Sequence, residues 1–365
     1  MSRAIPGLHH VTAIAGPPQA NVDFYVGTMR QRLVKRTVNF DAPDTYHLYY
    51  GDRAGSPGTI LTFFPFADAG PGRAGPGMAS AVAYRVPPGG LDAWMMRLAG
   101  DATDFEGPSA RFGERVIALA DRDGLRIELI EVSGPGGADA GADGAPTDDG
   151  FHSVTLWLRD PAPTARVLTG LFGYEAAGRE AADDGTERLR FRSPAGGRGS
   201  VVDLLRSGAP SIGRQGAGTI HHVAFRAETR EIQREWRERV AAFGLDVTPV
   251  IDRQYFDAIY FREPGGVLFE IATDPPGFAA DEALDELGLG LVGSEARRVG
   301  RNLKQDAPGL TEVDCIEVLP VDHGRDVEAE GGDALAPFAL DLLGLGAERD
   351  VVDRAGTLPA DGRGT

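Results

Sequence analysis

The chain has 365 residues, of which 42% are hydrophobic and 25% charged, as is usual for a soluble globular protein with room for more than one core. The formal net charge of −17 argues against nucleic acid as a partner, because phosphate binding needs a basic surface. Cys315 is the single cysteine, which excludes a disulfide within the chain and a thiolate metal site.

The sequence also gives no sign of a membrane or of export. No apolar run approaches the length that crosses a bilayer. Residues 1–18 lack the basic start and the long apolar stretch of a signal peptide. We therefore expect a cytoplasmic protein with no membrane partner, and a homo-oligomer is compatible with this composition.

Taken in chain order, the predicted elements repeat one unit, in which a strand and a helix are followed by further strands. In the first module, about residues 7–66, the predicted elements are a strand at His9–Ala15, a helix at about Gln19–Met29 and strands at Val34–Phe40, Tyr46–Tyr50 and Thr59–Phe64. In the second, about residues 79–131, they are a strand at Ala81–Val86, a helix at Leu91–Leu98 and strands at Arg115–Leu119 and Leu125–Ile130.

Residues 133–149 are rich in Gly, Ala, Asp and Pro without periodicity, which predicts a linker before the third module, about residues 150–206. The fourth module has the clearest pattern. Its predicted elements are a strand at Thr219–Phe225, a helix at Thr229–Phe243, strands at Asp246–Ile251 and Ala258–Arg262, and a last strand that follows a Pro-Gly-Gly turn at 264–266 and reaches Ile271. A short acidic helix is predicted after it, at Asp281–Leu287.

One such unit leaves a face of its curved sheet open and needs a partner unit. We therefore predict an α+β fold of four βαβββ modules in two cup-shaped barrels, with modules one and four in one cup and modules two and three in the other. The domains would be an N-terminal lobe at 7–132, a C-terminal lobe at 150–291, and an acidic, Gly/Asp-rich and partly disordered tail at 292–365.

Alignment of the four modules defines two equivalent positions in each. The first-strand position is occupied by His10, Ala81, Ser153 and His222, and the last-strand position by Thr62, Glu128, Asp203 and Glu270. Only modules one and four together supply two histidines and a carboxylate. Such a set leaves open positions on a metal and is associated with non-haem Fe(II) oxygenases, although Zn(II) or Mn(II) fits the same donors. Modules two and three supply two acids without an imidazole, so we expect one metal per chain.

Four of the seven histidines form two pairs at matched positions, His9-His10 and His221-His222. A lone buried histidine is usually structural, but two matched pairs beside a matched carboxylate favour a metal site. Neighbours on a strand point to opposite faces, so one histidine of each pair can face the cup while the other faces away or supports it.

Arg253 and Tyr260 lie in the module that supplies two of the three donors. A cation and a phenol there could orient a substrate hydroxyl group and stabilise charge on oxygen. The alternative is a surface arginine paired with Asp252 or Asp257, and a tyrosine packed at the rim of the sheet. Four aromatic residues could line a pocket for a flat substrate, although Tyr49 and Phe63 fit the core better: they are Tyr46, Tyr49, Phe63 and Phe256. His47 has no counterpart in the other modules and is expected to be structural.

Several of these stretches together carry a family resemblance. They are Leu8–Ile14, Tyr46–Tyr50, Ile220–His222, Asp252-Arg253 with Tyr260, and Pro264–Glu270. They resemble the vicinal oxygen chelate superfamily of glyoxalases, bleomycin resistance proteins and extradiol dioxygenases, and most of all its ring-cleaving dioxygenases that act on hydroquinones. The resemblance covers about residues 7–291, and the tail departs from it. It implies Fe(II) bound by His10, His222 and Glu270, and supporting catalytic roles for His9, His221, Arg253 and Tyr260.

The activity that the resemblance implies is Fe(II)-dependent opening of a hydroquinone- or catechol-type ring with O2, with Mn(II) as the other candidate metal. The partners would be a small aromatic substrate and O2, as in the degradation of aromatic compounds. Two alternatives stay open. A glyoxalase-type isomerase or lyase would use the metal as a Lewis acid, for which Thr62 is a poor fourth ligand. A quinone- or drug-binding protein of the same fold would need no metal.

Overall fold

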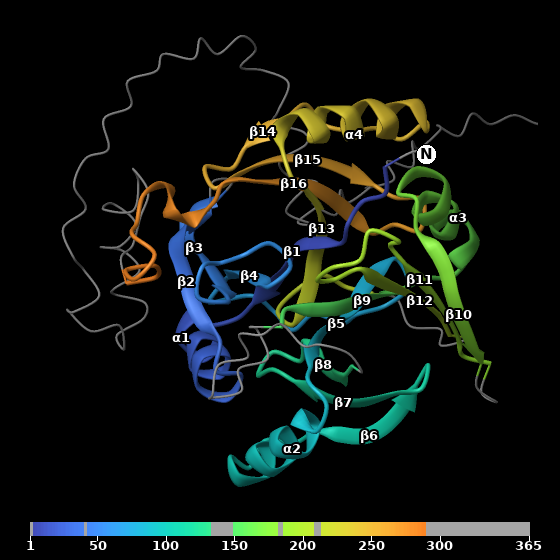
Figure 1. Ribbon diagram of the computed structural model, residues 1–365. Helices are drawn as coiled ribbons and strands as arrows, with labels where there is room; N and C mark the ends of the chain where they lie inside the picture. Colours follow the sequence, from blue (N-terminus) through green and yellow to red (C-terminus); the bar gives the residue numbers. More distant parts are fainter. Residues whose placement is uncertain (1–2, 40–41, 133–148, 182–184, 208–212, 290–365) are drawn as a thin grey trace, which may run out of the picture. The chain divides into compact units, whose positions relative to one another are not determined.

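The chain repeats one unit four times, in which a strand and a helix are followed by three further strands (Figure 1). The computed structural model describes residues 3–39, 42–132, 149–181, 185–207 and 213–289. All of these belong to one compact unit.

The elements of the first two modules end close to their predicted limits. Module one contains β1 (Leu8–Ala15), α1 (Pro18–Val22) with a π-helical continuation (Asp23–Thr28), β2 (Arg32–Asn39), β3 (Ala42–Gly51) and β4 (Ile60–Pro65). Module two contains β5 (Met78–Val86), α2 (Gly90–Gly100), β6 (Glu106–Arg111), β7 (Glu114–Ala120) and β8 (Arg126–Glu131).

Modules three and four repeat this order. Module three contains β9 (Phe151–Trp157), α3 (Pro161–Arg166) with a π-helical continuation (Val167–Leu171), β10 (Glu175–Ala181), β11 (Glu187–Arg192) and β12 (Val201–Arg206). Module four contains β13 (Thr219–Ala227), α4 (Arg230–Ala242), β14 (Ile251–Asp252), β15 (Phe256–Arg262) and β16 (Leu268–Pro276), and a 3-10 turn follows (Phe278–Ala280). None of the helices in these ranges combines the length and hydropathy that a membrane span requires.

The strands form two sheets, each built from one module of each predicted lobe. The first sheet has the order β14-β15-β16-β13-β1-β4-β3-β2, and the second has the order β10-β11-β12-β9-β5-β8-β7-β6. Modules one and four therefore share a sheet, as do modules two and three, and the predicted α+β fold with its pairing of modules is confirmed. The lobe boundaries at 132 and 150 stay predictions, and the tail at 292–365 lies outside the described residues.

The strand register confirms the alignment of the repeats. In every module the first and last strands pair in parallel, and the last-strand position lies opposite the residue two places after the first-strand position. These pairs are Thr62 with Thr12, Glu128 with Ala83, Asp203 with Thr155, and Glu270 with Ala224. The equivalent positions therefore project from the same face of each repeat, because the side-chain period of a strand is two residues.

The two faces of the first sheet differ in chemistry. His10, Thr12 and His222 project from one face, here called the inner face, since Thr12 pairs with His222 across β1 and β13. The residues between them, such as Val11 and Val223, are fully buried and belong to one hydrophobic core that includes residues of the second sheet. The core thus holds one side of the strands in place while the inner face carries polar groups.

Two strand predictions differ from the structure. The strand β6 was not predicted, and its first five residues are exposed, so no apolar alternation marks it. The strand predicted at Asp246–Ile251 is wrong for most of its length. Only a single bridge joins Val247 to Phe261 there, and Pro249 cannot donate to a strand ladder.

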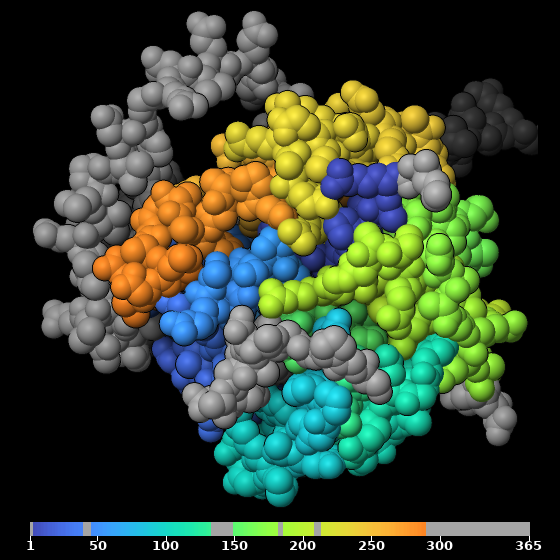
Figure 2. Space-filling view, viewed as in Figure 1, coloured from blue at the N-terminus to red at the C-terminus, as the bar shows by residue number. Residues whose placement is uncertain are grey.

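The segment after β16 folds against module one, as the orange and blue surfaces show in Figure 2. The helix predicted at Asp281–Leu287 is wrong, because these residues form turns and bends. Their polar groups bind the neighbouring strand instead: fully buried Lys35 on β2 pairs with Asp281 and Glu282, and Arg32 donates to the carbonyl oxygen of Leu287 at 3.2 Å.

Candidate metal centre

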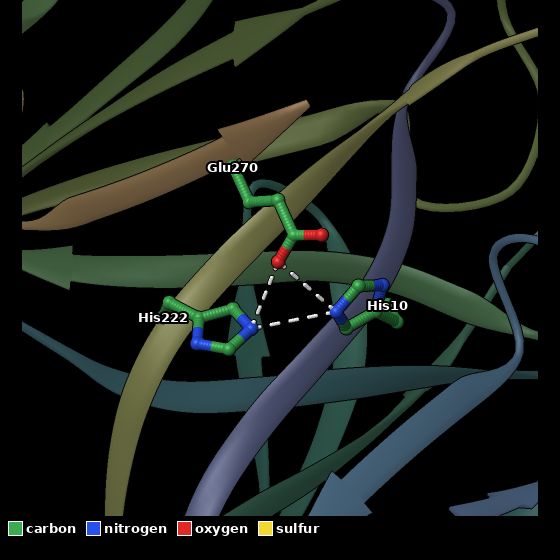
Figure 3. A group of neighbouring side chains, drawn as sticks. All are labelled: His10, His222 and Glu270. Atoms are coloured by element: carbon green, nitrogen blue, oxygen red, sulfur yellow. Dashed lines mark hydrogen bonds and ion pairs between the residues drawn. The ribbon is translucent and has the colours of Figure 1, made fainter. Parts of the chain in front are cut away.

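Three strands at the middle of the first sheet bring His10, His222 and Glu270 together (Figure 3). The Nε2 atoms of His10 and His222 lie 3.3 and 3.0 Å from Oε2 of Glu270, and 3.4 Å from each other. All three side chains are buried, and among the described residues they form the one group whose donor atoms converge closely enough to hold a metal ion. These are the three residues predicted as ligands.

The chemistry of the three donors fits a cation. Glu270 has no exposed surface, yet neither of its carboxylate oxygens accepts a hydrogen bond of good geometry from the described residues. Burial raises the pKa of Glu270, but the imidazoles of His10 and His222 outweigh it and hold that pKa below its usual range. A buried carboxylate without a hydrogen-bond donor is costly, and a metal ion between these donors would remove that cost.

His9 and His221 are each the extra residue of a β-bulge. Along the pairing of β1 with β13 the register skips His9, between Leu8 and His10, and it skips His221 opposite the step from Thr12 to Ala13. A bulge turns a side chain away from the regular alternation. His9 Nδ1 therefore reaches His10 Nδ1 at 2.9 Å, and His221 Nδ1 reaches His222 Nδ1 at 2.8 Å. Both supporting histidines thus contact the predicted ligands directly.

These contacts orient the imidazole rings of His10 and His222. Burial and the nearby His10 lower the pKa of His9 to about 3, so His9 is neutral and its Nδ1 can accept a hydrogen bond. If His10 donates from Nδ1, its Nε2 carries a lone pair that points at the site of convergence. Histidine ligands of metals are commonly held through their second nitrogen in this way.

The turn before β16 sets the position of Glu270. Buried Glu263 accepts hydrogen bonds from the backbone N–H groups of Gly265 and Val267, both at 2.9 Å. It also accepts one from Thr164 of module three at 2.6 Å. Gly266 has a φ of +105°, a conformation that glycine adopts without strain.

Arg253 and Tyr260 lie together on the module-four side of the site. Arg253 donates from Nε to the Tyr260 hydroxyl oxygen at 3.2 Å, and the rings of Tyr260 and His222 are 5.9 Å apart. Tyr260 lies directly opposite Glu270 across β15 and β16, so it shares the inner face with the ligands. The alternative pairing with Asp257 is not favoured, since Asp257 pairs with Arg230 at 2.7 Å.

A hydrogen-bonded chain on module one was missed in the sequence. The Tyr49 hydroxyl lies 2.7 Å from His47 Nδ1, and His47 Nε2 lies 2.9 Å from Thr62 Oγ1. Thr62 in turn donates to Thr12 Oγ1 at 2.9 Å. The sequence predicts a structural role for His47, which has no counterpart in the other modules, and a place in the core for Tyr49. Phe63 does lie in the core, whereas Phe256 packs against His10 with ring centroids 4.9 Å apart.

The equivalent positions of the second sheet are occupied by ion pairs. Glu128 receives a hydrogen bond from Arg111 at 2.9 Å, and Asp203 receives two from Arg190 at 2.8 and 3.0 Å. Both carboxylates are buried, and arginine side chains from β6 and β11 pair with them. The expectation of one metal per chain stays a prediction.

Comparison with known proteins places the chain in a family. The sequence profile of the Glyoxalase/Bleomycin resistance protein/Dioxygenase superfamily matches residues 150–271. A protein of Bacillus subtilis strain 168 named "Putative ring-cleaving dioxygenase MhqO" is 45% identical over 299 residues, which cover 80% of this chain and 92% of that protein. The chain belongs to this superfamily. A second relative, the chlorohydroquinone/hydroquinone 1,2-dioxygenase of Sphingobium indicum, is 35% identical over 302 residues, 78% of this chain and 90% of that protein.

Solved structures of the superfamily share the arrangement described above. A crystal structure of a "putative dioxygenase" from Bacillus subtilis is 42% identical and covers 87% of this chain and 100% of that chain, with a TM-score of 0.77. Glyoxalase I from Zea mays has a TM-score of 0.56 at 12% identity, covering 73% of this chain and 92% of that chain, which shows a common fold alone. The vicinal oxygen chelate resemblance is confirmed.

Proposed function

We propose that this protein is a ring-cleaving dioxygenase that opens a hydroxylated aromatic ring, of the hydroquinone or catechol type, with O2. The observation that carries the proposal is the convergence, on one face of the first sheet, of two imidazoles and a buried carboxylate whose oxygens accept no hydrogen bond from the described residues. The names of its relatives at 35–45% identity support the same reaction class. The substrate partners would be a small aromatic compound and O2.

We propose Fe(II) as the metal, held by His10, His222 and Glu270, with Mn(II) as the alternative. Bound there, Fe(II) would acidify a ring hydroxyl group and provide a route for electrons between the ring and O2. Two histidines and one carboxylate leave room on the metal for both reactants. The carboxylate oxygens of Glu270, which accept no hydrogen bond from the described residues, support a cation at this site.

The residues around the ligands would bind and orient the reactants. Arg253 and Tyr260, joined by their 3.2 Å hydrogen bond, present a cation and a phenol beside Glu270, where they can orient a substrate hydroxyl and stabilise developing negative charge. His221 or Tyr260 would take the proton of that hydroxyl. Phe256 covers His9 and His10 and limits the access of water to them.

Oxygen consumption tests this function. The protein is reconstituted with Fe(II) under anaerobic conditions, and O2 uptake is then measured with hydroquinones and catechols. Stoichiometric O2 uptake with loss of the aromatic absorbance is expected. Turnover of a substrate without O2 consumption would instead support the glyoxalase-type isomerase, and substrate binding without metal or turnover would support a sequestering protein. A cytoplasmic location and the absence of a nucleic-acid partner are proposed as well, the latter in keeping with the net charge of −17.

A further inference from the structure

Tyr49 of module one and Tyr260 of module four occupy the same position in their repeats. Tyr260 on β15 lies opposite the last-strand residue Glu270, and Tyr49 on β3 lies opposite the last-strand residue Thr62. Residues directly opposite each other in an antiparallel pair project from the same face. Because Thr62 and Glu270 both project from the inner face, the two tyrosines do so as well.

The curvature of the sheet brings these two tyrosines to opposite walls of one site. Five strand spacings separate β3 from β15 in the sheet order, which would be about 24 Å in a flat sheet. Yet the ring of Tyr49 lies 6.2 Å from that of Tyr255, the residue that precedes β15. Burial raises the pKa of the Tyr49 phenol, and Arg253 and Glu270 are close enough for their charges to act on it. Tyr49 thus faces the candidate metal centre.

The hydrogen-bonded chain behind Tyr49 has a defined direction. Thr62 donates its single hydroxyl proton to Thr12, so Thr62 can only accept from His47. His47 Nε2 therefore carries a proton. Burial lowers the pKa of His47, which keeps the ring neutral and leaves Nδ1 without a proton. Nδ1 then accepts the proton of the Tyr49 hydroxyl at 2.7 Å.

The consequence is a buried phenol oxygen that can accept a hydrogen bond but has no proton left to donate. Its hydroxyl proton is engaged with His47, which leaves a lone pair of the oxygen able to accept a hydrogen bond from a ligand. A ligand that meets this oxygen should offer an O–H or N–H donor. That donor must also lie at a distance from the metal-binding atoms, because β4, with Thr62, lies between β3 and β1 in the sheet.

We propose that Tyr49 accepts a hydrogen bond from the second hydroxyl group of a 1,4-dihydroxybenzene and thereby selects such rings over 1,2-dihydroxybenzenes. This inference rests on the proposed function. A 1,2-diol can place both oxygens on one metal and leaves no donor for Tyr49. A 1,4-diol can place only one oxygen there, and its second hydroxyl points to the far side of the site. His47 and Thr62 are positioning residues that fix the direction of the Tyr49 hydroxyl.

The test measures equilibrium binding as well as turnover. Protein loaded with redox-inert Zn(II) is titrated anaerobically by calorimetry with hydroquinone, catechol and 4-methoxyphenol, whose second oxygen has no proton. The variants are Tyr49→Phe and Thr62→Val. Tyr50→Phe is the matched control, since Tyr50 is the next residue of the same strand, is fully buried, and donates its hydroxyl proton to Asn21 at 2.9 Å, away from the inner face.

Wild-type protein should bind hydroquinone about three- to tenfold more tightly than 4-methoxyphenol, the range expected for one neutral hydrogen bond. Tyr49→Phe should abolish that ratio and leave both the affinity for catechol and the metal content unchanged, whereas Tyr50→Phe should keep the ratio. Thr62→Val removes the acceptor of His47 Nε2, so His47 can carry its proton on Nδ1 and donate to Tyr49. The freed Tyr49 proton should then shift the preference toward 4-methoxyphenol.

Three results would overturn the proposal. Wild-type protein could bind hydroquinone no better than 4-methoxyphenol, or Tyr49→Phe could keep the wild-type ratio of these two affinities. Tyr49→Phe could also lose as much affinity for catechol as for hydroquinone. An unchanged ratio in Thr62→Val would show that the direction of the chain is wrong. With Fe(II)-loaded protein, kcat/KM for hydroquinone should fall with the affinity. If wild-type protein consumes no O2 with any of the three compounds, the proposed function fails, while the binding ratios still decide the role of Tyr49.

Discussion

His221 Nδ1 lies 2.8 Å from His222 Nδ1, although consecutive residues of a regular strand point to opposite faces. The β-bulge at His221 allows this contact. The bulge at His9 allows the equivalent one, in which His9 Nδ1 lies 2.9 Å from His10 Nδ1. Each bulged histidine can therefore accept the Nδ1 proton of a predicted ligand and fix the orientation of its ring. The two histidines that orient the candidate ligands therefore reach them because β1 and β13 pair irregularly.

This relationship predicts different outcomes for two substitutions of His221. His221→Phe removes the acceptor and should weaken Fe(II) binding about 10- to 100-fold, as is usual when a partner of a metal ligand is lost. His221→Asn keeps an acceptor near the position of Nδ1, so it should restore much of the affinity. Competition with a metal chelator measures affinity, and equal affinities in the two variants would contradict the orienting role.

Arg253 and Tyr260 should affect turnover and leave metal binding intact. Both lie beside Glu270 on the inner face but are not among the converging donors. Tyr260→Phe and Arg253→Ala should therefore retain Fe(II), by elemental analysis, while kcat falls about 100-fold or more, as is common when a proton-transfer or charge-stabilising group is lost. Arg234→Ala is the control, because Arg234 is exposed on α4, away from the converging donors. Loss of iron from Arg253→Ala or Tyr260→Phe would make these residues structural supports instead.

The three converging side chains should be required for the metal but not for the fold. Glu270→Gln, His10→Ala and His222→Ala should each lose tight Fe(II) binding and O2 uptake and still unfold cooperatively. Saturating metal at about 1,000 times its Kd should stabilise the wild type by about 4 kcal/mol and the variant by none. Thermal unfolding with and without metal checks this, and a metal-dependent shift in Glu270→Gln would contradict the assignment.

The repeat structure and the convergence of three side chains were predictable because they follow from strand periodicity. Aligned first and last strands placed His10, His222 and Glu270 at equivalent positions, and the register of the parallel pairs reproduces that alignment. A pattern of period two identifies the face of the strand from which a residue projects. The pairing of module one with module four, and of module two with module three, follows because each open sheet face needs a partner module.

The parts that were missed depend on contacts that no periodicity records. Lys35 pairs with Asp281, 246 residues away, and the carboxylate that was interpreted as part of a helix is used in that contact. The direction of the Tyr49 hydroxyl depends on Thr62 and Thr12, which belong to two other strands. The bulges at His9 and His221 arise where β1 meets β13, so the sequence of either strand alone does not reveal them.

The second sheet should bind no transition metal, and its carboxylates should be indifferent to the activity of the first. Arg111 and Arg190 already neutralise Glu128 and Asp203, so a cation would have to displace buried, hydrogen-bonded guanidinium groups. Alanine at either acid would remove a charged partner from Arg111 or Arg190, so the isosteric Glu128→Gln and Asp203→Asn are the better probes. The double variant should keep one metal per chain, the Fe(II) affinity and the O2 uptake of the wild type, whereas Glu270→Gln at the equivalent position loses all three. Two tightly bound metals per chain by elemental analysis, or an anomalous scattering peak beside Glu128 and Asp203, would refute the prediction.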